Sequence, residues 1–137
     1  MKAAPKFRRF PKTARRVEPR RDNREGSAAD RGYDWEWSKF ADALKSQPDF
    51  ATCLVCRGQG RAVSTDAIDH IVPLDAVGKD LKFERANLQP LCRSCHTTKT
   101  AAIDKRARGY FLRLTRDGVC PRRAMVRVAT KFKGDVG

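Results

Sequence analysis

Four cysteines of the 137-residue chain fall in two pairs with metal-binding spacing. The pairs are Cys53-x2-Cys56 and Cys92-x2-Cys95, and 35 residues separate them. Two such knuckles supply the four thiolates of a tetrahedral Zn²⁺ site. Two unrelated pairs of buried thiols, or a redox pair, are the alternatives, but a redox pair belongs to a thioredoxin-like βαβ unit that this sequence does not show. We therefore predict a structural zinc ion and an incidental thiol at Cys120.

Both histidines of the chain lie in or beside the segment that the cysteine pairs bracket. His70 directly follows Asp69, and His96 directly follows the second cysteine pair. Asn87 lies between them, in the second half of the intervening loop. A zinc ribbon needs none of these side chains, so their joint presence indicates chemistry beyond zinc binding.

Two stretches carry a more specific signal, DAIDHIVPL at 66–74 and RANLQPLCRSCHTTKT at 85–100. Together with the upstream cysteine pair, they resemble the HNH (His-Asn-His) endonucleases. RGYDWEWSKFADAL at 31–44 is similar to the leader helix of the small phage-type members. The resemblance covers residues 27–104. It implies an α+β fold class: a small ββα-metal fold with a zinc knuckle pair, a leading helix and basic flexible arms.

The resemblance also implies a role for each motif residue. His70 corresponds to the general base that removes a proton from the attacking water. Asp69 and His96 correspond to ligands of one catalytic divalent ion. Asn87 matches the middle residue of the motif, and we expect it to brace the loop that holds the base rather than contact the metal. The structural zinc ligands correspond to Cys53, Cys56, Cys92 and Cys95.

Hydrolysis of a phosphodiester bond needs side chains of these kinds. Imidazole, with a pKa of about 6.5, accepts a proton at neutral pH, where a carboxylate is a poor base. A divalent ion held by one carboxylate and one imidazole keeps positions open for phosphate oxygen and acts as a Lewis acid. Because such a donor pair discriminates poorly between metals, we predict one catalytic ion that is Mg²⁺, Mn²⁺, Ni²⁺ or Zn²⁺.

A short strand is predicted over 67–72, ended by Pro73, and it contains both Asp69 and His70. Adjacent residues of a regular strand point to opposite faces. Either the strand bends here, or Asp69 reaches inward to a metal under the following helix while His70 faces the DNA groove. We expect the second arrangement.

Other elements follow from apolar spacing. A helix with Asp34 as its N-cap is predicted, and ordered structure is expected to begin there. Its apolar stripe consists of Trp37, Phe40, Ala41 and Leu44. A second helix is predicted from Ser94 to Gly109, after an irregular segment at 73–90. The tail from residue 110 mixes apolar residues with arginines, so it either docks on the domain or becomes ordered only on DNA.

The net charge of +14 is carried by the two ends of the chain. Residues 1–24 hold ten basic and two acidic side chains, and residues 105–133 hold ten basic and one acidic. Clustered positive charge favours a polyanionic partner through counterion release, and we expect DNA. We divide the chain into a basic, largely disordered arm (1–30), an HNH nuclease domain (31–109) and a basic C-terminal extension (110–137). Candidate phosphate contacts are Arg85, Arg93 and Lys99.

Two classes of function are compatible with these features. One is a metal-dependent DNA endonuclease that acts as a monomer and either nicks DNA or cuts both strands. The other is a zinc-ribbon nucleic-acid-binding protein without catalysis. All four motif positions are filled, which favours the endonuclease. The phage-type resemblance further implies a cytoplasmic location and an association with the terminase in DNA packaging.

Composition excludes two other classes. No run of 18 or more apolar residues is present, so a membrane span is not expected. The basic N-terminal segment lacks the apolar stretch of a signal peptide, so we do not expect a secreted, disulfide-stapled protein.

Overall fold

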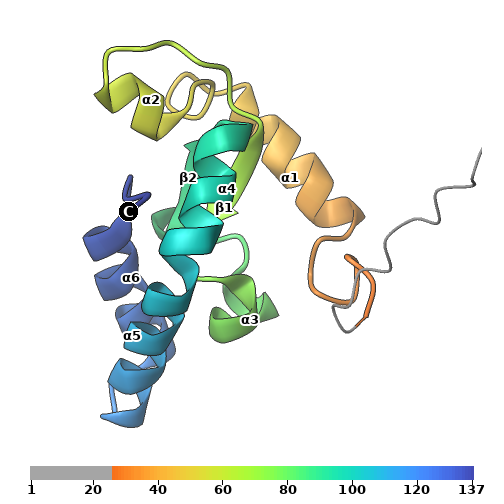
Figure 1. The fold of residues 1–137 in the computed structure, drawn as a ribbon. Coiled ribbons are helices and arrows are strands. Elements are labelled where there is room, and N and C mark those ends of the chain that lie inside the picture. Colours follow the sequence, from red (N-terminus) through yellow and green to blue (C-terminus); the bar gives the residue numbers. More distant parts are fainter. Residues whose placement is uncertain (1–25) are drawn as a thin grey trace, which may run out of the picture.

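The computed structural model of the protein describes residues 26–137 and shows helices arranged around a small sheet (Figure 1). Strands β1 and β2 pair antiparallel, and α4 packs on both of them. This unit is consistent with the ββα-metal fold, so the predicted α+β class is confirmed. In chain order the elements are α1 (Trp35–Lys45), α2 (Leu54–Gly58), β1 (Ala67–His70), α3 (Leu74–Val77), the 3-10 helices η1 (Lys79–Leu81) and η2 (Arg85–Asn87), β2 (Leu88–Leu91), α4 (Arg93–Ala102), α5 (Asp104–Arg116) and α6 (Pro121–Phe132).

Helix α1 forms where the apolar stripe predicted it and packs against the sheet. The Asp34 side chain caps it by accepting a hydrogen bond from the Trp37 N–H at 3.0 Å, which confirms the predicted N-cap. The α1 side chains Trp37, Ala41 and Leu44 share a core cluster with Phe50, Ile68 and Leu88. This packing fixes α1 beside the strand that carries Asp69 and His70.

Ordered structure begins before Asp34, contrary to the expectation. Residues 26–33 form a turn in which the Tyr33 N–H donates to the Ala28 carbonyl at 3.0 Å. Gly32 has φ +97°, and a Cβ there would lie 2.8 Å from the Leu74 side chain, so this turn is fitted closely to α3. Residues 1–25 of the predicted disordered arm lie outside the described residues.

The predicted end of the second helix at Gly109 is wrong. The helix breaks at Ile103, and α5 then continues through Gly109 to Arg116. The reason is that Phe111 and Leu114 extend the buried stripe beyond the glycine. Their burial contributes about 1.5–3 kcal/mol each, more than the cost of about 1 kcal/mol for a glycine inside a helix.

The extension from residue 110 docks on the domain. Helices α5 and α6 form a hairpin, and Met125, Val128 and Phe132 of α6 share a core cluster with Ile71 and other residues near the strand. The expected boundary between residues 109 and 110 therefore falls inside α5. None of the helices between residues 26 and 137 is long and apolar enough to cross a membrane.

Candidate active site and metal centre

The four paired cysteines converge on one point. Their sulfur atoms all lie within 4.8 Å of one another, and Cys56 Sγ is 3.8 Å from both Cys92 Sγ and Cys95 Sγ. A tetrahedral site with Zn–S bonds of about 2.3 Å places its sulfurs about 3.8 Å apart. The four cysteines that the spacing singled out do lie together, and they could hold a metal such as zinc.

The two cysteine pairs come from separate elements. Cys53 caps α2 and Cys56 lies within it, whereas Cys92 caps α4 and Cys95 lies in its first turn. Burial opposes ionisation of Cys53, but hydrogen bonds from the backbone of Cys56 and Cys92 outweigh burial and lower its pKa to about 7. A thiolate is the form that a metal requires, and a metal here would join α2 to α4.

His70 lies at the end of β1 with its ring held on two sides. Its Nε2 is 2.9 Å from the Lys82 carbonyl oxygen, and the Trp37 ring stacks on it with centroids 4.5 Å apart. A carbonyl only accepts, so Nε2 donates and Nδ1 is the basic nitrogen of the neutral ring. Burial lowers the pKa of His70, which keeps the imidazole in the neutral form that a general base needs.

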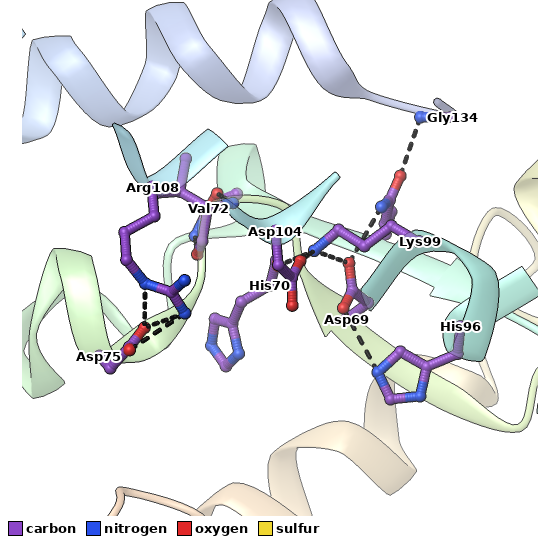
Figure 2. A network of polar contacts seen from close by, with 11 residues as sticks. Asp69, His70, Val72, Asp75, His96, Lys99, Asp104, Arg108 and Gly134 are labelled. Carbon is purple, nitrogen blue, oxygen red and sulfur yellow. Dashed lines mark hydrogen bonds and ion pairs between the residues drawn. The ribbon is translucent and has the colours of Figure 1, made fainter. Parts of the chain in front are cut away.

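Asp69 directs its two oxygens to different partners. Oδ2 is 2.8 Å from Lys99 Nζ and accepts from Gln89 Nε2 at 3.0 Å, while Oδ1 is 3.4 Å from His96 Nε2 (Figure 2). Burial opposes ionisation of Asp69, but the contacts with His96 and Lys99 outweigh it and hold its pKa below the ordinary value. The hydrogen bond to Asp69 in turn raises the pKa of His96.

Asp69 Oδ1 and His96 Nε2 are suitably placed donors for one ion. Two metal–ligand bonds of about 2.0–2.2 Å together span more than the 3.4 Å between these atoms, so a single ion can contact both. His96 is partly exposed, which leaves this side of the pair open to solvent. Asp69 and His70 leave the strand in different directions, as expected for neighbouring residues of a strand (Figure 2).

Asn87 is fully buried and bonded to the loop that follows β1. Its Nδ2 donates to the Val72 carbonyl at 3.0 Å, and its Oδ1 accepts from the Val72 N–H at 2.8 Å. The side-chain nitrogen and oxygen of Asn87 therefore both bond to the backbone of Val72, two residues after His70. This is the geometry of a brace.

The HNH endonuclease family model matches residues 53–102, which include both cysteine pairs and the four motif residues. The chain is 36% identical over 80 residues to the "Probable HNH endonuclease" of Lactococcus phage SK1, a match that covers 56% of this chain and 81% of that protein. The chain belongs to the HNH endonuclease family. No solved structure matches it.

Family membership supports a nuclease function in general, with DNA as the substrate, over a binding module without catalysis. The matched region begins at Cys53 and ends at Ala102, so the α5–α6 hairpin lies outside the HNH family model. In this chain, the hairpin packs against Ile71 and Val72, which follow β1 within the matched region.

The prediction that Lys99, in helix α4, contacts DNA phosphate is wrong. Its ammonium is fully buried, and it lies 2.6 Å from the His70 carbonyl oxygen, 2.8 Å from Asp69 Oδ2 and 2.6 Å from Asp104 Oδ1. A side chain enclosed in this way cannot reach DNA phosphate. Lys99 instead holds the backbone carbonyl of His70 and the carboxylate of Asp69.

Two partners of the HNH site were missed by sequence reasoning. Gln89 lies opposite Asp69 in the sheet and links it to the segment that follows α6, because its Oε1 accepts from the Gly134 N–H at 2.9 Å. Asp104 reaches Lys99 from the start of α5. Gln89 could have been placed beside Asp69 only from the antiparallel register of the two strands. No local sequence pattern indicated that Asp104 reaches the site.

The other two predicted phosphate contacts are on the surface. Arg85 pairs with Asp49 at 3.2 Å and with Gln47 at 3.0 Å. Arg93 is exposed in the first turn of α4, beside the cysteine cluster. Both positions are accessible, and their contact with DNA stays a prediction.

We expect Lys99→Met to lower the free energy of unfolding by about 3–4 kcal/mol, because it leaves the buried Asp69 and the partly buried Asp104 without their cation. Urea denaturation of the zinc-loaded protein, with no other metal added, measures this. The matched control is Lys39→Met on the exposed face of α1, which should change stability by less than about 0.5 kcal/mol. Equal stability of the two variants would contradict the structural role of the buried ammonium.

Proposed function

We propose that the protein is a divalent-metal-dependent DNA endonuclease. In this proposal His70 is the general base, and Asp69 and His96 hold one catalytic ion. The observation that carries the proposal is the pairing of Asp69 Oδ1 with His96 Nε2 at 3.4 Å, with the buried His70 next to Asp69 in β1. Family membership supplies the reaction class.

The protein side of the mechanism follows from the hydrogen bonds. With Nε2–H directed at the Lys82 carbonyl, His70 takes the proton of the attacking water at Nδ1. Lys99 and Gln89 keep Asp69 ionised and leave its Oδ1 toward His96. The Nε2 atom of His96 must give up the proton that it directs at Asp69 before it can act as a metal ligand. When bound, a divalent ion supplies Lewis-acid stabilisation of the charge that develops on the phosphate.

We also propose that the ion held by the four cysteines is structural zinc. The four thiolates complete a tetrahedral set and leave no open position for substrate, which is the pattern of structural zinc sites. Association with a phage terminase and a monomeric state stay predictions from the sequence.

Loss of one metal ligand gives a specific test. We expect His96→Ala to weaken Mn²⁺ binding by more than about 100-fold, since even the loss of a residue that only hydrogen-bonds to a metal ligand costs about 10–100-fold in affinity. Isothermal titration of Mn²⁺ into the zinc-loaded protein measures the affinity, and cleavage should be partly restored at high Mn²⁺ concentration. Thr97→Ala, at an exposed neighbouring position on α4, is the control. Unchanged Mn²⁺ affinity in His96→Ala would rule out His96 as a ligand.

A further inference from the structure

A basic hollow of about 500 Å³ lies on the α5–α6 hairpin. None of the described residues that line it is acidic. Five of the eight lining residues are cationic: Lys105, Arg106, Arg113, Arg116 and Lys131. We call this feature the α5–α6 groove.

The fold does not require this concentration of charge. The core side of α5 is formed by Ala107, Phe111 and Leu114, so its cations lie on the side that faces solvent. Like charges three or four residues apart on a helix, such as Arg113 and Arg116, destabilise it by a few tenths of a kcal/mol. Because no acidic side chain lines the groove to neutralise these cations, an anionic ligand would be attracted to it.

Gly109 is a second, independent feature of the groove. It is exposed in the middle of α5, and no heavy atom lies within 4 Å of where its Cβ would be. Alanine would stabilise the helix by about 1 kcal/mol, so neither packing nor backbone conformation explains the glycine. Its effect is to leave space in the wall of the groove, where the ligand can approach the helix backbone.

The aromatic rings of the groove select phosphate rather than bases. The Tyr110 ring is covered by the Arg113 guanidinium at 5.3 Å and by Lys131 Nζ at 5.2 Å, and Phe132 is buried. Sites for single-stranded nucleic acid offer open ring faces on which bases stack. Here the rings hold the cations, which suits the backbone of a duplex.

The length of the α5–α6 groove fits a short stretch of duplex DNA, the substrate of the HNH site. From Arg106 to Arg116, α5 rises about 15 Å, which corresponds to about four base pairs along the axis of a DNA duplex. Lys105 at the end of the groove follows Asp104, which contacts Lys99 and, through it, Asp69. The groove and the candidate active site are therefore connected through α5, which carries both Lys105 and Asp104.

We propose that the α5–α6 groove binds the phosphate backbone of the duplex that the HNH site cleaves. The identity of this ligand rests on the proposed function, but binding can be measured without cleavage. The probe is a fluorescein-labelled 30-base-pair duplex, titrated with zinc-loaded full-length protein between 50 and 300 mM KCl with no other metal added.

The charge test compares two double variants. The double variant Arg113→Gln with Arg116→Gln should make the plot of log affinity against log salt shallower. Its negative slope should shrink in magnitude by about 1.8, since each lost phosphate contact removes about 0.9. Lys39→Gln with Lys45→Gln removes the same charge from α1, outside the groove, and should leave the slope nearly unchanged. Equal effects of the two pairs, or none from the groove pair, would overturn the proposal; the latter is also the result expected if the groove binds an acidic protein.

The shape test keeps the charge constant. Gly109→Leu should raise the melting temperature, because leucine favours a helix, and should weaken duplex binding by about tenfold or more because its side chain fills the groove. Wild-type affinity in this variant would overturn the proposal. If wild-type protein binds the duplex with the expected slope but does not cleave DNA, the proposed function fails and the groove stands.

Discussion

His70→Ala should lower the rate of DNA cleavage by about 10²–10⁴-fold, the usual contribution of a general base. The substitution removes the imidazole that donates to Lys82 and stacks on Trp37, but it leaves Asp69 and His96 in place. The rate should be measured by plasmid nicking at saturating DNA and Mn²⁺.

Two controls separate a lost base from a damaged fold. His70→Ala should retain one zinc per chain and bind Mn²⁺ with nearly wild-type affinity, and added imidazole should restore part of the activity. Cleavage at the wild-type rate with zinc intact would remove His70 from the mechanism. Loss of Mn²⁺ binding together with cleavage would assign His70 to the metal site instead.

Cys92→Ser should abolish zinc binding and unfold the domain at ordinary temperatures. Cys92 begins α4 and contributes one of the four convergent sulfurs, so its loss separates α4 from α2. Structural zinc contributes on the order of 10 kcal/mol of apparent folding energy, which is comparable to the whole stability of a small domain. Zinc content by mass spectrometry of the native protein and a thermal melt measure the effect.

Cys120→Ser is the matched control, because Cys120 is exposed at the start of α6 and outside the cysteine cluster. It should keep both zinc and the melting temperature. If Cys92→Ser also kept one zinc per chain and an unchanged melt, the cysteine cluster would not be what holds the fold together.

The parts of the site that could be predicted are those that local spacing determines. The Cys-x2-Cys pairs place two sulfurs about a turn apart, and the four cysteines do converge. Strand alternation anticipated that Asp69 and His70 point apart, and Asp34 caps α1 as its position before the apolar stripe indicated. In these cases the physical cause lies within a few residues of the signal.

The features that were missed depend on contacts between distant segments. Lys99 was expected on the surface because lysine usually is, and its burial follows from Asp104 and Asp69 reaching it from other elements. Gly109 indicated a helix end, but the core that receives Phe111 is built partly by α6. No window of sequence around either residue contains that information.

The most direct test is the metal dependence of cleavage by the wild-type protein. Zinc-loaded protein, dialysed free of other metals and verified to hold one zinc per chain, is incubated with supercoiled plasmid with and without Mn²⁺. We expect nicked or linear DNA only with the added ion, and none from Asp69→Asn, which removes the carboxylate of the proposed site. Equal cleavage by both proteins, or by the wild type without added metal, would contradict a catalytic ion held by Asp69 and His96.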